Sequence, residues 1–279
     1  MEQSDLDAYF QRIGCTGGPR AATLETLSVL HLHHAQAIAF ENLDPFSGRP
    51  VNLDLPSLQR KLVHQGRGGY CFEHNLLFSQ VLQALGFRVT GLAARVVWNA
   101  PEGAERPRSH MVLRVDLGDE PYIADVGFGG QTLTGPLRLA PGLAQPTPHE
   151  VFRLIGQQEE FLLETQLGDT WKPLYRFDLQ QQFPVDYEAM SWYVSTHPQS
   201  HFVNNLMVAR PVPGKRYGLF NNELTVHDLK GGTEKRTLGT AAEIRATLET
   251  YFGLRLPPDA LWQQVYGVAI NRFFSSQVS

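Results

Sequence analysis

The chain has only two cysteines, Cys15 and Cys71, among its 279 residues. At most one disulfide can form, so the fold does not depend on a disulfide framework, and we expect both thiols to be reduced. No apolar run approaches the roughly 18 residues that span a bilayer. The start MEQSDLDAYF is acidic and amphipathic, unlike a secretion signal. We therefore expect a cytoplasmic protein with no membrane partner.

The sequence also lacks an excess of positive charge. Lysine and arginine together number 24, against 28 aspartates and glutamates, so the net charge is −4. Because nucleic acids and anionic lipids bind basic surfaces, small molecules are the expected partners, and nucleic acid is not. Hydrophobic residues make up 42% of the chain, as in globular proteins. A chain of 279 residues is longer than a domain with a single hydrophobic core usually is. Two or three domains are therefore expected.

The first third of the chain has the sequence pattern of helices. Ser4 and Asp7 form a capping signal in an amphipathic stretch that Gly14 ends. After Cys71 the apolar residues repeat with a period near 3.6, and Gly86 stands where a helix end favours glycine. The pattern therefore predicts that Cys71 begins a helix.

From residue 87 the pattern changes to alternating segments rich in β-branched residues, which predict an antiparallel meander. The expected strands are 87–98, 110–117, 122–128, 151–155, 160–165 and 174–179. Near the end of the chain, Thr240 and Glu243 form a capping box for another helix. The overall pattern is α+β, with helices first, then strands, then a mixed segment.

Cys71 has the sequence context of a nucleophile. The N–H groups and positive dipole at a helix start stabilise a thiolate, which is the reactive form of cysteine. Gly68 and Gly69 permit a sharp turn just before it and a close approach of the main chain to a ligand. A lone cysteine is more often a small buried apolar residue, so its partners decide between the two interpretations.

The hairpin after residue 109 supplies such partners. Gly118 and Asp119 suit the two-residue loop of a type II′ turn. Counting outward from that loop places His110 opposite Gly127 and one diagonal step from Asp125, so their side chains project to the same face. A buried aspartate needs such a partner, and thiol, imidazole and carboxylate together predict a catalytic triad. The alternative is an edge-strand Asp125 that faces water.

The remaining histidines have weaker signals. Cys71 and His74 have the spacing of a C-x-x-H pair, which His110 and Asp125 would complete as a metal site. We expect no metal, because the triad already explains these residues and a metal would quench the thiolate; His74 is then expected to make local hydrogen bonds in its helix. The tract of His31, His33 and His34 is interpreted as surface or capping histidines. Cys15 receives no role.

Five motifs in order resemble those of the arylamine N-acetyltransferase family, and of its bacterial members most. They are AIAFENLD at 37–44, RGGYCFEHN at 67–75, SHMVLRV at 109–115, YIADVGFGG at 122–130 and STHPQSHF at 195–202. The resemblance implies three domains around a papain-like Cys-His-Asp core. They are a helical bundle (1–86) with the nucleophile, a β-barrel (87–188) with the histidine and aspartate, and an α/β lid (189–279) with an interdomain helix.

The resemblance also implies the chemistry. Acetyl-CoA acylates Cys71, CoA leaves, and an arylamine, arylhydrazine or N-hydroxyarylamine takes the acetyl group in a ping-pong reaction. By similarity, Ser109, Gly127 and Gly129 contact the cofactor, and Phe40, Phe128 and Phe202 line the acceptor pocket. The chain departs from the family at Ala39, where many relatives have proline, and at His74, where bacterial relatives often have leucine.

Two other classes stay open. A cysteine hydrolase of transglutaminase or papain type would share the triad and pass the acyl group to water or act on peptides. A non-catalytic domain would use the same fold for binding alone. We expect either a monomer or a homodimer.

Overall fold

The structure is a computed structural model that describes residues 1–18, 20–101, 103–157 and 160–274. The last five residues of the predicted C-terminal domain and Glu102 of the loop after the first predicted strand lie outside this description.

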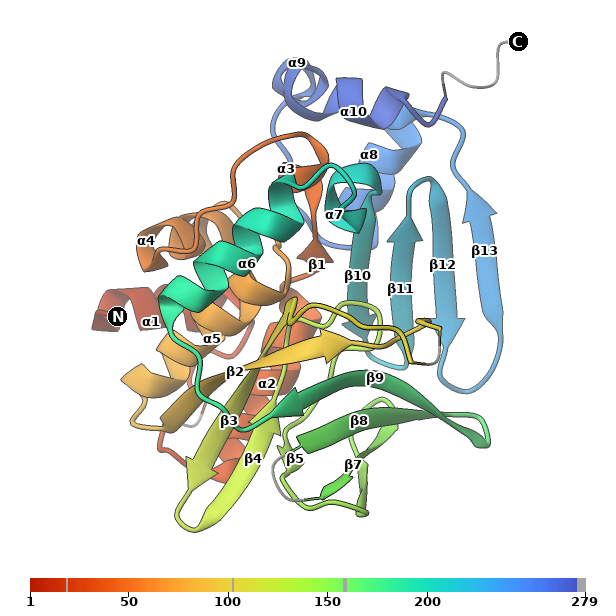
Figure 1. Ribbon diagram of the computed structural model, residues 1–279. Coiled ribbons are helices and arrows are strands. Elements are labelled where there is room, and N and C mark those ends of the chain that lie inside the picture. The colour runs from red at the N-terminus through yellow and green to blue at the C-terminus, as the bar shows by residue number, and fades with distance from the viewer. Residues whose placement is uncertain (19, 102, 158–159, 275–279) are drawn as a thin grey trace.

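The N-terminal helices surround the segment that carries Cys71 (Figure 1). They are α1 (Gln3–Arg12), α2 (Leu24–Ala37), α3 (Leu43–Phe46), α4 (Leu55–Leu58), the π-helical segment η1 (Gln59–His64) and α5 (Cys71–Ala84). The predicted start of α5 at Cys71 is confirmed, and Gly86 follows with a φ of 87°. The predicted cap of the first helix is wrong. The helix begins two residues earlier, with Glu2 as its N-cap, and the backbone N–H of Glu2 donates to Asp5 (3.1 Å).

Eight strands form an antiparallel sheet that is nearly closed on itself. They are β2 (Arg88–Val96), β3 (His110–Leu117), β4 (Glu120–Ala124), β5 (Leu137–Arg138), β6 (Ala144–Pro146), β7 (Val151–Gln157), β8 (Glu160–Leu167) and β9 (Thr170–Asp178). Their order is β5-β4-β3-β2-β9-β8-β7-β6. The Gln145 amide in β6 exchanges two hydrogen bonds with the Arg138 backbone in β5 (2.7 and 2.9 Å), so the two edge strands meet.

The predicted strand 122–128 ends early, at Ala124. Beyond that point side chains take the backbone hydrogen bonds that a neighbouring strand would otherwise supply. The N–H of Val126 donates to Asn75 (3.1 Å) and that of Phe128 to Thr132 (3.3 Å). Asp125 therefore lies just past the strand, on a segment that side chains hold in place.

A second antiparallel sheet and the remaining helices make up the C-terminal part. Its strands, in spatial order, are β1 (Phe40–Glu41), β10 (Met207–Val212), β11 (Lys215–Phe220), β12 (Glu223–Asp228) and β13 (Thr233–Thr237). The helices are α6 (Pro184–Thr196), α7 (His201–Asn204), α8 (Ala241–Thr250), α9 (Asp259–Trp262), the π-helical segment η2 (Gln263–Gly267) and α10 (Val268–Asn271). The predicted N-cap of α8 is confirmed, since Thr240 accepts the N–H of Glu243 (3.1 Å), but the predicted capping box is not completed, because the Glu243 carboxylate accepts the N–H of Gly239 (2.6 Å).

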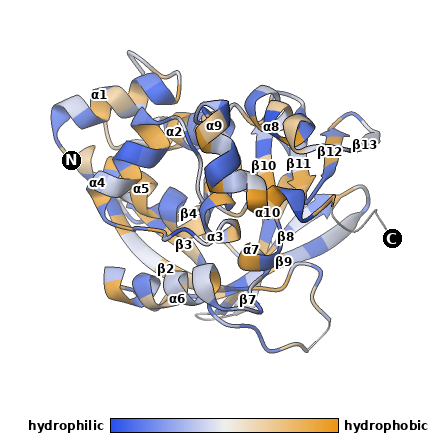
Figure 2. Cartoon of the chain, turned by 90° about the horizontal axis from the view of Figure 1, so that it is seen from above, coloured by the Kyte–Doolittle hydropathy of each residue, from blue (hydrophilic) through white to orange (hydrophobic). Residues whose placement is uncertain are grey.

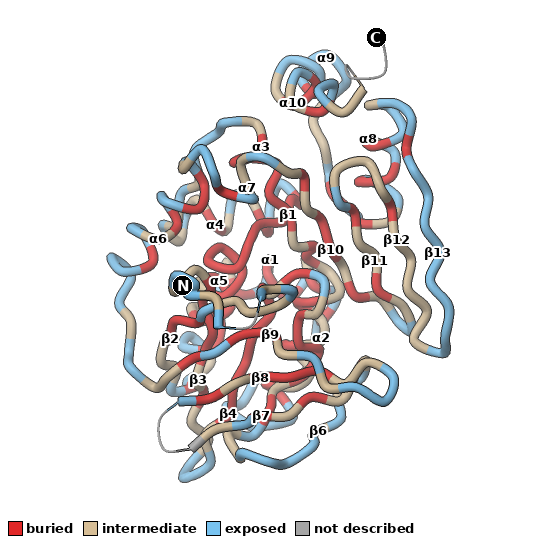
Figure 3. Tube along the Cα trace, turned by 45° about the vertical axis from the view of Figure 1, so that its right-hand side comes forward, coloured by how far each residue is buried: buried red, intermediate tan, exposed pale blue. Residues whose placement is uncertain are grey.

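Three clusters of buried apolar residues hold these elements together. One joins α1, α2 and α5 to β3 and β4, and another fills the eight-stranded sheet. The third lies under the C-terminal sheet and includes Ala39, Leu43 and Phe46 from the first third of the chain. Each helix has both apolar and polar residues along its length (Figure 2). Buried residues concentrate on the central strands, whereas β13, at the edge of its sheet, is exposed along its whole length (Figure 3). Residues 39–46 thus link the nucleophile region to the C-terminal sheet.

Within the described ranges, no helix combines the length and the apolar character that crossing a membrane requires.

Candidate active site

Cys71 lies at the first position of α5, directly after its N-cap Tyr70. The Glu73 carboxylate accepts the N–H of Tyr70 (3.0 Å), which completes a capping interaction and fixes the start of the helix. The thiol is 3% exposed, and its Sγ lies 3.7 Å from the carbonyl oxygen of Ser109. The thiol therefore sits at the positive end of a helix and beside the residue that precedes His110.

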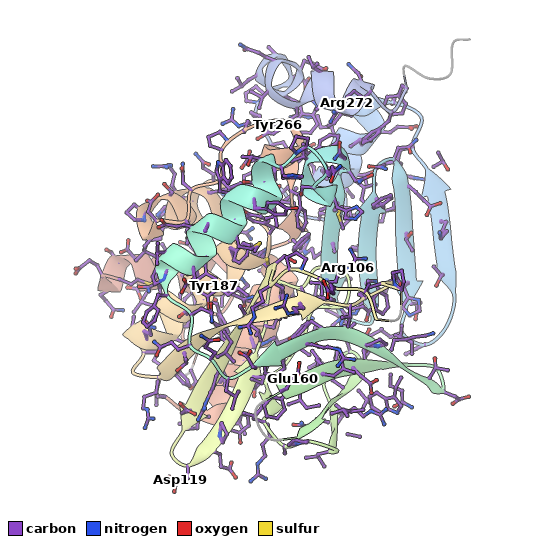
Figure 4. The ribbon with its side chains drawn as sticks, in the orientation of Figure 1. Arg106, Asp119, Glu160, Tyr187, Tyr266 and Arg272 are labelled. Carbon is purple, nitrogen blue, oxygen red and sulfur yellow. The ribbon has the colours of Figure 1, made fainter. Side chains whose placement is uncertain are left out.

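His110 and Asp125 meet as predicted, but the predicted pairing of His110 with Gly127 does not form, because the strand pairing ends at Leu113 with Ala124. The strands pair from Leu117 with Glu120 as far as Leu113 with Ala124, and Gly118 in the turn has a φ of 61°. Asp119 marks the outer end of this hairpin in Figure 4. At the inner end, His110 Nε2 donates to Asp125 Oδ2 (2.7 Å).

Both members of this pair are inside the protein. Asp125 is fully buried and His110 is 2% exposed. The alternative of an edge-strand aspartate that faces water is therefore wrong, because the chain beyond β4 turns inward against α5.

The two side chains stabilise each other in their charged forms. Burial lowers the pKa of His110, but the charge of Asp125, the hydrogen bond to it and a side-chain hydrogen bond with Cys71 raise that pKa to about 10. Burial raises the pKa of Asp125, but the charge of His110 and hydrogen bonds from His110, Asn75 and Gly127 lower it below its ordinary value. An imidazolium held by a carboxylate thus faces the thiol at neutral pH.

Asn75 is a site residue that the sequence analysis missed. Its Nδ2 donates to Asp125 Oδ1 (3.0 Å) and to the carbonyl of Met111 (2.7 Å), and its Oδ1 accepts the N–H of Val126. Asn75 stands four residues after Cys71, on the same face of α5. That spacing is the signal that would have found it, since a polar residue there faces the same elements as the nucleophile.

Three glycines let the main chain close around Cys71. A Cβ on Gly68 would lie 2.0 Å from the carbonyl oxygen of Ala39, and one on Gly69 would lie 2.6 Å from the Glu73 carboxylate. A Cβ on Gly127 would lie 2.9 Å from the Cα of Cys71. These glycines are therefore required for close packing of the turn and of the segment after Asp125 against the start of α5.

The three phenylalanines predicted to bind the acceptor gather at this site, and all three are half-buried. The ring of Phe128 stands edge-on to His110, with ring centroids 5.2 Å apart. The ring of Phe202 lies 6.1 Å from that of Phe40 and 5.7 Å from that of Tyr70. Aromatic faces from three distant parts of the chain thus surround the start of α5.

The residues predicted to contact the cofactor lie in the same region. Ser109 contacts the thiol through its carbonyl, and Gly129 packs against the ring of Phe40. The N–H of Gly127 donates to Asp125 Oδ1 (2.9 Å), so that group is already engaged. The assignment of these residues to cofactor binding stays a prediction.

The interpretation of the histidine tract as surface or capping residues is wrong for His31 and His34, which are fully buried. The N–H of Asp125 donates to His31 Nε2 (3.1 Å). His34 bonds to His74 on α5 (2.9 Å), so the expectation of local hydrogen bonds for His74 is also wrong. Helix α2 packs these histidines against the Asp125 segment and α5, and contacts this far apart in the chain leave no local pattern.

The structure gives His74 partners other than a metal. Its two ring nitrogens bond to His34 and to the carbonyl of Ala39 (3.2 Å). Within the part of the chain that the structure describes, no group of three or more histidine, cysteine, aspartate or glutamate residues is placed to hold a metal ion.

A buried ionic cluster behind the nucleophile turn was also missed. Lys61 Nζ lies 2.7 Å from both Asp44 and Glu73, and Arg67 lies 2.7 Å from Glu41. Arg67 also donates to the hydroxyl of Tyr266 in η2. Since Arg67 begins the turn and Glu73 caps α5, the cluster braces both ends of the segment that presents Cys71.

The buried histidines predict a pH-dependent stability. Burial lowers the pKa values of His31 and His74 to about 4, against about 6.5 in an unfolded chain. Between these values the unfolded chain binds more protons, so the free energy of unfolding falls as the pH drops. Each residue contributes up to about 1.4 kcal/mol per pH unit.

Between pH 6.5 and 4.5 the free energy of unfolding is therefore expected to fall less in His74→Gln than in the unmodified protein. The difference between the two decreases is roughly 2 kcal/mol. Urea unfolding at several pH values measures this difference. His201→Gln, which changes an exposed histidine, serves as the control and should follow the unmodified protein. Parallel pH dependences for the unmodified protein and His74→Gln would contradict the prediction.

Fold and site together point to one class of proteins. A family model described as N-acetyltransferase matches residues 23–261. The solved structure of the Mycobacterium marinum arylamine N-acetyltransferase in complex with CoA superposes with a TM-score of 0.90 at 42% identity, over 96% of this chain and 98% of that one. The protein thus has the fold of an N-acetyltransferase.

Similarity to curated proteins narrows the class. The arylamine N-acetyltransferase of Mycobacterium tuberculosis is 46% identical over 256 residues, 90% of each chain. The arylamine N-acetyltransferase / N-hydroxyarylamine O-acetyltransferase of Salmonella typhimurium is 41% identical over 90% of this chain and 89% of its own length. This chain belongs to the arylamine N-acetyltransferase family, and the resemblance predicted from its five motifs is confirmed.

Proposed function

We propose that this protein transfers an acetyl group from acetyl-CoA to arylamines, arylhydrazines or N-hydroxyarylamines through an acetyl-Cys71 intermediate. The observation that carries the proposal is the thiol at the start of α5 beside an imidazolium that Asp125 holds by a 2.7 Å hydrogen bond. The names of the relatives support CoA, arylamines and N-hydroxyarylamines, since one was solved with CoA and another is named for both N- and O-acetylation, whereas arylhydrazines follow from the motif resemblance.

In the first half-reaction the Cys71 thiolate attacks the thioester carbonyl of acetyl-CoA. The new S–C bond forms, the bond between the carbonyl and the CoA sulfur breaks, and His110 gives its proton to the leaving CoA thiolate. Backbone N–H groups in the first turn of α5 stabilise the oxyanion, because that turn leaves them without helical partners. Asp125 holds the ring in place throughout.

In the second half-reaction the amine attacks acetyl-Cys71. His110, now neutral, takes a proton from the amine as its N–C bond forms, and the Cys71 thiolate leaves and restores the ion pair. Phe40, Phe128 and Phe202 provide the flat apolar surfaces that stack on an aromatic acceptor. Ser109, Gly127 and Gly129 are proposed to contact acetyl-CoA, whose pyrophosphate suits a glycine-rich loop.

The domain division is proposed along the same lines. Residues 1–86 form the helical bundle, 87–188 the β-barrel and 189–279 the α/β lid with its interdomain helix, around a papain-like core. The cluster that fills the nearly closed sheet lies within 87–188 and supports the second unit, whereas the first cluster joins the helices to β3 and β4 across the boundary at residue 86. The cytoplasmic location, the monomeric or dimeric state and the absence of nucleic-acid and membrane partners stay predictions.

Incubation with acetyl-CoA alone tests the function. We expect intact-mass spectrometry to find one added acetyl group, located on Cys71, that disappears when an arylamine such as aniline is added. Cys71→Ser should abolish the label, whereas Cys15→Ser, which changes the other cysteine, should keep it.

Other results would point elsewhere. Loss of the acetyl group to water without an amine would favour the cysteine hydrolase. A protein that takes up no label, or takes it up on Cys15, would overturn the proposal and favour a binding domain.

A further inference from the structure

A chain of three hydrogen bonds runs through the interior from α1 to the segment before Phe40. Tyr9 bonds to His34 Nδ1 (2.8 Å), His34 Nε2 to His74 Nδ1 (2.9 Å), and His74 Nε2 to the carbonyl of Ala39 (3.2 Å). All four residues are 0% exposed. These three hydrogen bonds thus link α1, α2 and α5 to the carbonyl group of Ala39.

The last acceptor sets the direction of every bond. The carbonyl of Ala39 only accepts, so the proton of His74 is on Nε2 and its Nδ1 accepts. His34 must then donate from Nε2 and accept at Nδ1 from the hydroxyl of Tyr9. Both histidines are neutral in this arrangement, in agreement with burial, which lowers their pKa values below the ordinary range.

The carbonyl of Ala39 lies at the contact between two segments of the active site. It also accepts the N–H of Gly69 (3.4 Å), while the N–H of Glu41 donates to the carbonyl of Gly69 (2.7 Å). The segment that carries Phe40 is thereby held against the turn that leads to Cys71.

Residues 39–42 also bind the backbone of Phe202, the residue that carries the neighbouring aromatic ring. Asn42, two residues after Phe40, donates to the carbonyl of Phe202 (2.8 Å). Since the rings of Phe40 and Phe202 are neighbours, a shift of residues 39–42 moves both rings.

We propose that His74 is a positioning residue that holds the Ala39 carbonyl and so sets the place of Phe40 and Phe202 relative to Cys71. The inference rests on the proposed function and names the step it serves, which is acceptance of the acetyl group by an aromatic amine. His74 acts through the Phe40 segment. The start of α5 itself is capped independently by Glu73.

Leucine at this position would fill the space without needing any partner. A buried polar chain costs desolvation and is favourable only when every member is bonded. Here Tyr9, His34 and His74 are all hydrogen-bonded. The last of these bonds fixes the direction of the Ala39 carbonyl, which apolar packing would not do.

Three variants of His74 separate this role from a structural one. His74→Gln keeps one donor and one acceptor at a spacing close to that of the two ring nitrogens. His74→Asn carries the same groups but is one methylene shorter, so it reaches His34 and not Ala39. His74→Leu removes both bonds.

The first measurement uses the two half-reactions. For the Asn and Leu variants we expect the KM for aniline to rise roughly ten-fold, with the rate of Cys71 acetylation changed less than about three-fold. His74→Gln should behave like the unmodified protein in both half-reactions.

The second measurement does not require acetyl transfer. The rates at which 2-iodoacetanilide and iodoacetamide alkylate Cys71 are compared, because only the first reagent carries a ring that Phe40 and Phe202 can contact. We expect the ratio of these rates to fall roughly five-fold in the Asn and Leu variants and to recover in His74→Gln.

The outcomes are distinct. An unmodified protein that takes no acetyl group overturns the proposed function, and the alkylation ratio still decides the role of His74. A lower melting temperature with an unchanged KM and an unchanged alkylation ratio shows a structural role only and overturns the inference. A His74→Gln variant as impaired as His74→Leu overturns it as well. If His74→Leu does not fold, the KM and the alkylation ratio of His74→Gln are compared with those of His74→Asn, and this comparison decides whether His74 is a positioning residue.

Discussion

Asp125→Asn is expected to lower turnover with acetyl-CoA and an arylamine by about four orders of magnitude, or about 5 kcal/mol of transition-state stabilisation. Three groups now donate to this carboxylate: His110 to Oδ2, and Asn75 and Gly127 to Oδ1. An asparagine of the same shape has only one oxygen to accept them. Its amide nitrogen must face at least one donor or force His110 into the other tautomer.

The loss of charge matters as much as the loss of an acceptor. The charge of Asp125 is the main contribution that raises the pKa of His110 against the effect of burial. Without it, burial favours the uncharged ring, and the imidazolium needed for the proposed ion pair with a Cys71 thiolate is lost. A tautomer with its proton on the wrong nitrogen cannot serve both half-reactions.

Steady-state kcat/KM with a circular-dichroism check of folding measures the effect. Asp119→Asn makes the same chemical change at the exposed end of the same hairpin (Figure 4) and should keep nearly full activity. Near-normal acetyl transfer by a folded Asp125→Asn variant would remove Asp125 from the mechanism.

Gly68→Ala is expected to destabilise the protein by about 3 kcal/mol and to displace the nucleophile turn. The new Cβ would lie 2.0 Å from the carbonyl oxygen of Ala39 and 2.9 Å from the side chain of Glu41. The first contact is with backbone, and that carbonyl is held by His74 and Gly69. Relief therefore requires movement of the Phe40 segment or of the turn itself.

Urea unfolding and the rate of Cys71 acetylation measure the two consequences. Gly130→Ala is the matched control, because no atom lies within 4 Å of its new Cβ and its φ is not in the left-handed region. We expect that variant to unfold within about 0.5 kcal/mol of the unmodified protein. Equal stability of the two variants would show that the turn adapts, and would contradict the close packing described here.

Much of the candidate site could be predicted from the sequence because its main signals are local. The apolar period after Cys71 places that residue at a helix start. A two-residue loop determines the pairing of the hairpin as far as Leu113 with Ala124, and the segment just beyond that pairing brings Asp125 to His110. The five motifs identify the family. The cofactor contacts of Ser109, Gly127 and Gly129 and the domain boundaries have no such confirmation and stay predictions.

The tertiary structure alone decided what supports the proposed triad. The contacts of Asn75 and His31 with the Asp125 segment depend on how α2 and α5 pack against the hairpin. His34 and His74 are 40 residues apart in the chain, and the short strand at Phe40 pairs with β10 from the last third. Helical periodicity and turn chemistry act within a few residues and determine where elements begin and which face is apolar. The choice of buried polar partners follows from the packing of whole elements, so the sequence by itself determined the residues proposed to react, and the assembled fold determined how they are held.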